Sequence, residues 1–201
     1  MKYAFYTLGC KVNQYETQAM QQLLLARGDT LGEFDGVCDC YIVNTCTVTA
    51  VSDKKSRNAI RRARKLNPNA VIGVCGCYAQ TAPEEIRKLD VDVLIGTDGR
   101  AEFLDKMAAA AAEKLRWEHV EDAGLPRAFE QLPSGGLAER TRALLKVEDG
   151  CNNFCTYCII PYARGRVRSL PLENAVAEAR KLAAEGYREI VVNGIEISSW
   201  G

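Results

Sequence analysis

Short apolar runs alternate with amphipathic stretches through the first half of the chain. The apolar runs predict strands, and the stretches between them predict helices, because apolar residues recur there with helical spacing. The predicted strands are 3–8, 41–44, 70–75 and 91–95, and the predicted helices are 15–27, 49–66, 83–89 and 100–115. Apolar strands separated by helices predict an α/β fold, in which a doubly wound parallel sheet carries helices on both faces.

A second pattern begins after a segment of mixed charge that ends in a turn-rich break at 132–136. It predicts a strand at 143–147, a helix at 172–185 and a strand at 189–193. We therefore expect an N-terminal domain at 1–116, a linker at 117–140 and the beginning of a second domain at 141–201. One strand–helix–strand unit cannot bury both of its faces, so we expect this second domain to be truncated and the chain to be a fragment.

Composition is that of an ordinary globular protein, with 47% apolar and 26% charged residues and a formal net charge of zero. The N-terminus does not resemble a signal peptide, and no apolar run reaches the roughly 18 residues of a membrane helix. We therefore expect a cytoplasmic protein without membrane association. The chain has nine cysteines, and an odd number in a cytoplasmic protein favours metal binding over disulfides.

Three cysteines each follow a different predicted strand of the N-terminal domain: Cys10, Cys46 and Cys77. The carboxyl ends of parallel strands meet at one edge of a sheet, where ligands gather. We therefore expect these three thiols to lie near one another. Spacing leaves Cys75 open as an alternative ligand to Cys77. We expect Cys38 and Cys40 to be free thiols, and the alternatives are an accessory metal site or a redox pair.

The tightest group of cysteines lies in the loop after the strand at 143–147. Cys151, Cys155 and Cys158 have the spacing C-x3-C-x2-C, and cysteine thiolate is the usual ligand of a 4Fe–4S cluster. Three ligands leave one iron open for a substrate or cofactor, much as a catalytic zinc site keeps one position open. The alternative is a structural zinc site, which needs a further ligand, and the single histidine, His119, is distant in sequence.

This spacing, with Tyr157 before the last cysteine, resembles the radical S-adenosylmethionine (SAM) signature. The longer string VEDGCNNFCTYCIIPYARGR at 147–166 resembles the radical SAM methylthiotransferases, as do TLGCKVNQYET at 7–17, NTCTVT at 44–49 and GCYAQ at 76–80. The resemblance implies that 141–201 begins a radical SAM βα barrel, and that its cluster cleaves SAM to a 5′-deoxyadenosyl radical. It also implies a second, auxiliary 4Fe–4S cluster, bound by Cys10, Cys46 and Cys77.

Within that family, the string at 9–17 is most similar to the threonylcarbamoyladenosine tRNA branch. The implied function is tRNA modification, by methylthiolation of carbon-2 of threonylcarbamoyladenosine beside the anticodon. The implied cofactors are two 4Fe–4S clusters and SAM, and the implied partners are tRNA and an electron donor such as flavodoxin or ferredoxin. We expect a monomer, inactive as this 201-residue chain alone.

Three alternatives to this function remain at this point. Two are enzymes of the same family, an isopentenyladenosine tRNA methylthiotransferase and a ribosomal-protein aspartate methylthiotransferase. The third belongs to another class, a non-catalytic zinc or iron–sulfur module that binds RNA.

Basic residues suggest where RNA binds. The helix at 49–66 carries seven basic residues against the single acidic Asp53, which predicts a phosphate-binding stripe or a solvated face. The residues predicted to contact RNA are Arg57, Arg61, Arg64, Lys65, Arg164, Arg166 and Arg168. The resemblance to the radical SAM signature implies that Tyr157 binds the cofactor. Barrel strands present ligands at their carboxyl ends, which adds Asn193 and Gly194 to the predicted cofactor-binding residues. No catalytic residue is assigned beyond the cluster ligands.

Overall fold

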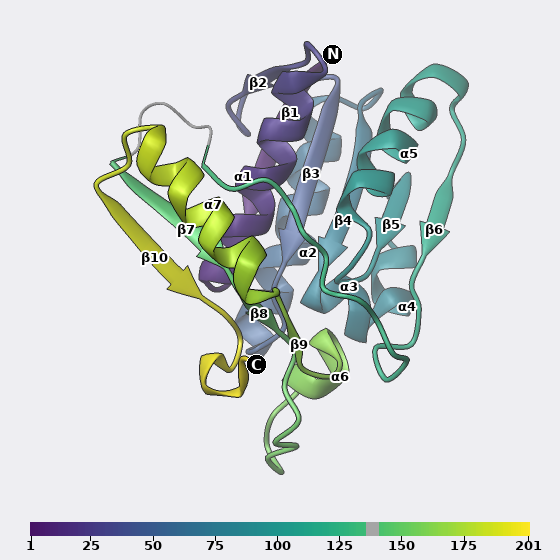
Figure 1. Ribbon diagram of the computed structural model, residues 1–201. Helices are drawn as coiled ribbons and strands as arrows, with labels where there is room; N and C mark the ends of the chain where they lie inside the picture. Colours follow the sequence, from purple (N-terminus) through teal and green to yellow (C-terminus); the bar gives the residue numbers. More distant parts are fainter. Residues whose placement is uncertain (136–140) are drawn as a thin grey trace.

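A six-stranded parallel sheet forms the centre of the N-terminal part (Figure 1). The structure, a computed structural model, describes residues 1–135 and 141–201. The strands lie in the order β2–β1–β3–β4–β5–β6, and every neighbouring pair is parallel. Their bounds are β1 Lys2–Thr7, β2 Thr30–Gly32, β3 Cys40–Thr45, β4 Val71–Gly76, β5 Val93–Ile95 and β6 Trp117–His119.

Helices cover both faces of this sheet, as the sequence predicts for a doubly wound fold. On one face, Met20 of α1 (Lys11–Ala26) and Phe103 of α5 (Arg100–Glu113) pack with Ile42 of β3. On the other face, Ile60 of α2 (Ala50–Leu66) packs with Val43, together with side chains from α3 (Cys77–Thr81) and α4 (Pro83–Arg87). The α2 helix begins at the predicted position because the Thr49 hydroxyl accepts a hydrogen bond from the Ser52 amide.

The second part of the chain contains a smaller parallel sheet. Strands β7 (Arg142–Lys146) and β10 (Glu189–Asn193) pair along their whole length, and helix α7 (Leu172–Ala184) covers one face. The other elements of this part are β8 (Glu148–Asp149), α6 (Ile160–Arg164), β9 (Arg168–Ser169) and the 3-10 helix η1 (Ile197–Ser199). This is the strand–helix–strand unit that the sequence predicts, with its boundaries almost unchanged.

The second face of the small sheet packs on α1 of the first domain (Figure 1). Tyr15 and Ala19 of α1 form a buried cluster with Leu144 of β7 and with Leu132 of the connecting segment. The Tyr15 hydroxyl donates a hydrogen bond of 2.6 Å to the Leu132 carbonyl. The unit therefore packs both faces within this chain, one under α7 and one against α1, although Val192 of β10 stays 50% exposed. The sequence reasoning did not foresee the contact with α1.

Some elements of the structure differ from the predicted ones. Residues Trp117–His119, predicted to begin the linker, form the edge strand β6, which pairs in parallel with β5. A three-residue, largely exposed strand has no apolar run to reveal it. Helix α1 begins at Lys11 rather than at Tyr15, and the short helix α3 was not predicted. Among the described residues, no helix is long and apolar enough to cross a membrane.

Candidate metal centres

The first three predicted ligands lie at the carboxyl edge of the large sheet. Cys10 follows β1 and precedes α1, Cys46 follows β3, and Cys77 begins α3 directly after β4. These three strands are adjacent, with β3 between the other two. From β1 the chain continues to β2, toward one edge of the sheet, and from β3 it continues to β4, toward the other edge. The direction in which strands are added therefore reverses between β1 and β3. Doubly wound sheets bind ligands at this reversal.

Asn13 connects the loops that carry Cys10 and Cys46. The Cys10 thiol donates to Asn13 Oδ1 over 3.3 Å, and Asn13 Nδ2 donates to the Thr45 carbonyl over 2.9 Å. The backbone at Gly9 has a φ of +110°, and a Cβ placed there would lie 3.0 Å from the Cys46 Cβ. Glycine at this position thus allows the Cys46 side chain to lie against the backbone that precedes Cys10.

Cys77 is contacted from the second part of the chain. Arg164, the last residue of α6, donates from Nε to the Cys77 sulfur over 3.3 Å, and from Nη2 to Asn13 Oδ1 over 3.0 Å. Burial raises the pKa of the Cys77 thiol, and the Arg164 guanidinium acts in the opposite direction. A single arginine therefore reaches the surroundings of both Cys10 and Cys77.

Arg164 belongs to a buried network of charges between the two parts of the chain. Glu16 of α1, which is 0% exposed, forms ion pairs with Arg164, with Lys146 over 3.3 Å and with Arg100 over 3.0 Å. Burial alone would raise the pKa of Glu16, but these three cations lower it to about 2. The carboxylate is therefore held in its charged form.

Asp149 extends the same network toward the cysteine-bearing loop. Its Oδ2 atom accepts from Lys146 over 2.6 Å and pairs with Arg164 and Arg168, each over 3.3 Å. Its Oδ1 atom accepts from the Gly150 amide over 2.9 Å. Against the effect of burial, the three cations hold the pKa of Asp149 well below its usual range. The ion pairs of Asp149 thus fix the end of β8, where the cysteine-bearing loop begins.

The second group of predicted ligands lies on that loop, between β8 and α6. Cys151 is buried, Cys155 is exposed and Cys158 is half-buried. The Cys151 amide bonds to the Gly165 carbonyl over 3.0 Å, and the Cys158 amide bonds to the Cys155 carbonyl over 2.9 Å. Helix α6 follows Cys158 directly and packs against α3, which begins with Cys77. The two groups of cysteines therefore border the same pair of packed short helices.

The carboxyl end of the small sheet supplies two buried oxygen acceptors without a partner among the described residues. They are Asn193 Oδ1, at the end of β10, and Glu148 Oε1, at the start of β8. Burial raises the pKa of Glu148, whose other oxygen accepts from the Glu196 amide over 2.7 Å. Gly194 lies against this carboxylate, because a Cβ there would be 2.6 Å from Glu148 Oε2. Tyr157, predicted to bind the cofactor, is 89% exposed on the loop.

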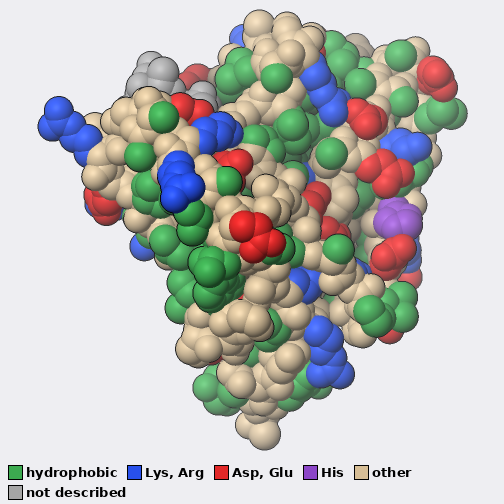
Figure 2. Space-filling view, in the orientation of Figure 1, with side chains coloured by type: hydrophobic (Ala, Val, Ile, Leu, Met, Phe, Trp, Pro, Cys, Tyr) green, Lys and Arg blue, Asp and Glu red, His purple; other side chains and the backbone are tan. Residues whose placement is uncertain are grey.

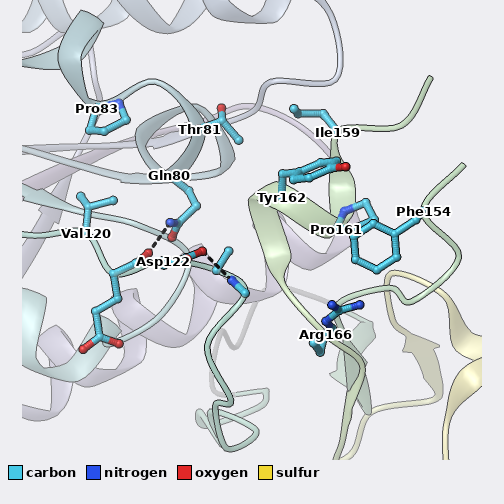
Figure 3. Close-up of a pocket in the computed structure, with 13 residues that line it drawn as sticks. Gln80, Thr81, Pro83, Val120, Asp122, Phe154, Ile159, Pro161, Tyr162 and Arg166 are labelled. Carbon is cyan, nitrogen blue, oxygen red and sulfur yellow. Dashed lines mark hydrogen bonds between the residues drawn. The ribbon is translucent and has the colours of Figure 1, made fainter. Parts of the chain in front are cut away.

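A cleft of about 720 Å³ opens beside the cysteine-bearing loop (Figure 3). Gln80, Val120 and Asp122 line one side, and residues of the loop and of α6 line the other. The Arg166 guanidinium lies 4.5 Å from the centre of the Phe154 ring, and the Phe154 and Tyr162 rings meet edge to face at 5.8 Å. Exposed rings and a cation of this kind are typical of surfaces that stack unpaired bases.

The other three cysteines lie in the interior, and Cys75, near the end of β4, is close enough to Arg100, Glu16 and Arg164 for their charges to affect its pKa. Cys40 and Cys75 are 0% exposed in the core beneath α1 and α5, and burial raises the pKa of each to about 12. Cys38 is buried on the opposite face of the sheet. The described residues contain no group of three or more His, Cys, Asp or Glu side chains placed to hold a single metal ion. Ligands of a 4Fe–4S cluster bind different irons, so they need not converge as the ligands of one ion do.

The basic residues predicted to contact RNA have different surroundings. Arg61 and Lys65 are exposed on α2, and Arg166 is exposed in the cleft. The Arg57 guanidinium bonds to the Tyr78 hydroxyl over 2.7 Å, and Arg64 pairs with Asp90, with Asp92 and with nearby carbonyls. Arg164 and Arg168 are buried in the ion-pair network, which corrects the expectation that they face RNA.

On the face shown in Figure 2, acidic and basic side chains are interspersed rather than gathered in one basic patch. This distribution agrees with the zero formal net charge of the whole sequence. A nucleic-acid contact on this face would therefore depend on a few individual side chains rather than on a broad positive field.

Sequence reasoning missed the charged partners that join the two parts: Glu16, Arg100, Glu130, Lys146 and Asp149. Only Lys146 gave a usable signal, because it lies inside the otherwise apolar run at 143–147, where a charge needs a buried partner. Glu16 occupies a helix in which a polar residue is ordinary, and its partner Arg164 is 148 residues away. Pattern alone could not connect them.

Two family models match the chain in succession. The first, described as Uncharacterized protein family UPF0004, matches residues 2–96, and the second, the Radical SAM superfamily, matches residues 145–200. The first match covers the large sheet through β5, and the second begins within β7.

Curated relatives are similar along nearly the whole chain. Threonylcarbamoyladenosine tRNA methylthiotransferase MtaB of Bacillus subtilis is 46% identical over 98% of this chain and 44% of its own length. The protein of the same name from Aquifex aeolicus is 38% identical, over 100% of this chain and 49% of its own. A tRNA-2-methylthio-N(6)-dimethylallyladenosine synthase of Thermotoga petrophila is 34% identical, over 100% and 45%. The chain thus spans about half the length of the curated relatives it matches.

A solved structure has a similar fold. It is the radical SAM methyltransferase TsrM from Kitasatospora setae, with cobalamin and a 4Fe–4S cluster bound. The TM-score is 0.61, over 98% of this chain and 49% of that chain. Because the identity is only 15%, this likeness concerns the fold alone.

Proposed function

We propose that this chain, which resembles the radical SAM methylthiotransferases along nearly its whole length, is the cluster-binding half of a tRNA methylthiotransferase. The proposed reaction is methylthiolation of carbon-2 of threonylcarbamoyladenosine, since the two relatives of that name reported above are 46% and 38% identical, against 34% for the dimethylallyladenosine synthase. The observation that carries the proposal is the pairing of two cysteine groups across α3 and α6. Either group alone would fit many iron–sulfur proteins.

The residues present fit two 4Fe–4S clusters. Cys10, Cys46 and Cys77 would hold an auxiliary cluster at the edge of the large sheet, and Cys151, Cys155 and Cys158 would hold the radical SAM cluster. Each group provides three thiols and leaves one iron open for another ligand. The auxiliary group lies at the topological reversal of the sheet, and the second group lies on a loop anchored by Asp149.

The end of the small sheet fits SAM. Glu148 Oε1 and Asn193 Oδ1 are buried acceptors without a partner in the described chain, and both lie beside the cluster loop. An ammonium or hydroxyl group would satisfy them, and SAM carries both. When bound, SAM and its cluster supply a radical able to remove hydrogen from an unactivated carbon. The chain's own residues orient the ligand: Gly194 keeps the backbone close to the Glu148 carboxylate.

The cleft beside the loop fits the substrate base. Phe154 and Tyr162 offer ring surfaces, and Arg166 offers a cation, next to the predicted radical SAM cluster. Such surfaces bind bases that are splayed out of a single-stranded loop. Exposed Arg61 and Lys65 on α2 would contact phosphates. A cytoplasmic enzyme of this kind would also require an electron donor, such as flavodoxin or ferredoxin.

For the domains, we propose a first domain that runs from residue 1 through β6 at His119 and a second domain that starts with β7 at Arg142. The support is that β6 lies at the edge of the large sheet, whereas β7 pairs, among the described residues, with β10 alone. The segment between them packs on both parts, through Leu132 and through Phe129.

Anaerobic reconstitution with iron and sulfide tests the proposal. We expect about eight irons per chain, the number that two 4Fe–4S clusters require. We also expect added SAM to change the electron paramagnetic resonance signal of only one cluster. Stoichiometric zinc without a brown chromophore would instead support a non-catalytic RNA-binding module. Eight irons without any response to SAM would support an electron carrier.

A further inference from the structure

We propose that Arg164 is a positioning residue of the auxiliary cluster, supplied by the second part of the chain to a site built on the first. It would hold Cys77 in place and set the charge around the cluster. This inference rests on the proposed function, because it assumes that Cys10, Cys46 and Cys77 bind a cluster. No cysteine of the radical SAM loop is involved in it.

The contacts of Arg164 support this role. Its Nε atom donates to the Cys77 sulfur over 3.3 Å, and its Nη2 atom donates to Asn13 Oδ1 over 3.0 Å. The same Asn13 oxygen accepts from the Cys10 thiol over 3.3 Å. The remaining contacts of the guanidinium, to Glu16 and Asp149, fix its plane and its position. One planar group thus contacts Cys77 directly and is linked to Cys10 through Asn13.

The charge around Arg164 gives a second, independent reason. The buried network joins four cations to three carboxylates: Arg100, Lys146, Arg164 and Arg168 against Glu16, Glu130 and Asp149. Within this network the Arg164 guanidinium is 0% exposed and is the cation that contacts the Cys77 sulfur. A buried cation is stabilised by the negative charges it contacts, and the thiolate form of Cys77, the form that binds iron, would add one to those of Glu16 and Asp149.

Two consequences follow for a cluster bound to Cys77. Hydrogen bonds to the sulfur ligands and the net charge around a cluster set its reduction potential. A fixed cation and an N–H donor both favour the reduced, more negative state. In addition, the auxiliary site is complete only when α6 packs on α3, so the second part of the chain tunes a cluster that it does not ligate.

The experiment uses the full 201-residue chain with Cys151, Cys155 and Cys158 changed to alanine, so that only the auxiliary cluster can form. Into it are placed Arg164→Gln and, as the matched control, Arg100→Gln. Arg100 is equally buried and pairs with the same Glu16, but among the described residues its bonds and ion pairs are with Glu16 and Glu130 and not with a proposed ligand. Iron content, the electron paramagnetic resonance spectrum and the midpoint potential are measured for each.

We expect Arg164→Gln to shift the reduction equilibrium at least about tenfold toward the oxidised cluster, which is about 59 mV for one electron. The Arg100→Gln control should keep the parent potential, and Arg164→Lys should recover part of the shift. If Arg164→Gln does not fold, Arg164→Lys is compared with Arg100→Lys, and a smaller shift in the same direction is expected. Equal potentials for the Arg164 and Arg100 variants would overturn the proposal. A parent that binds no cluster would instead refute the proposed function.

Discussion

The Glu16 side chain offers the sharpest test of how the two parts of the chain are joined. Its two carboxylate oxygens contact Arg100, Lys146 and Arg164, and all four side chains are 0–1% exposed. Glu16→Gln keeps the volume of the side chain but removes its charge. The substitution leaves three buried cations to share the remaining carboxylates, so we expect a large loss of stability.

Two independent arguments give the size of that loss. The difference between an ordinary glutamate pKa of 4.5 and the value of about 2 at Glu16 corresponds to about 3 kcal/mol. Removal of one partner from a buried ion pair typically costs about 3–5 kcal/mol. We therefore expect Glu16→Gln to lower the free energy of unfolding by about 3–5 kcal/mol at pH 7, measured by urea denaturation.

The pH dependence of this loss has a definite sign. The folded-state pKa of Glu16 is lowered, so its stabilisation is fully present above pH 4.5 and disappears as pH falls through about 2. The difference between the parent and Glu16→Gln should therefore stay constant from pH 7 to pH 5 and shrink below pH 4.5. The control is Glu113→Gln, an exposed position on α5, with an expected effect below about 0.5 kcal/mol. A loss under about 1 kcal/mol at pH 7, or a gap that is insensitive to pH, would refute the reasoning.

Three further predictions concern ligands. Changing Arg61 and Lys65 together to alanine should weaken tRNA binding in a filter-binding titration. The slope of log binding constant against log salt concentration should fall by the amount expected for roughly two lost phosphate contacts, and an unchanged slope would remove α2 from the interface. Cys75→Ala should keep the full iron content, because Cys75 lies in the core, and loss of iron would make it a ligand. Gly194→Ala places a Cβ 2.6 Å from Glu148 Oε2, so calorimetry should show SAM affinity falling about tenfold, whereas unchanged affinity would place SAM elsewhere.

Much of the fold was predictable because the central strands are apolar throughout. All six residues of β3 and all six of β4 are buried, so their runs stand out in the sequence. The edge strands β2 and β6 have three residues each and are partly exposed, which leaves no run to detect. The α1 helix begins before its predicted start because Val12 already faces the core directly after the Cys10 turn.

The candidate site was predictable only in part, and for a similar reason. Strand ends locate Cys10, Cys46 and Cys77, because parallel strands present their carboxyl ends at one edge. No local pattern joins Arg164 to Cys77, which are 87 residues apart and meet only through the packing of α6 on α3. The same packing buries Arg164, which the sequence analysis had predicted to contact RNA. Side-chain partners across a domain contact require the tertiary structure.

The docking of the second part on α1 has a structural consequence for both cysteine groups. The same helix follows Cys10, carries Asn13 and Glu16, and packs its Tyr15 and Ala19 against the small sheet. Displacement of that sheet would therefore disturb the surroundings of Cys10 and Cys77 as well as the cluster loop. The two sites are joined by one helix and one ion-pair network.

The central claim is that the chain holds two separate clusters, and reciprocal triple variants test it most directly. In one variant the cysteines at 10, 46 and 77 become alanine, and in the other those at 151, 155 and 158 do. After anaerobic reconstitution, each variant should retain about four irons per chain, against about eight in the parent. SAM should perturb the spectrum only of the variant that keeps Cys151, Cys155 and Cys158. Loss of all iron from either variant, or retention of all iron, would contradict the account.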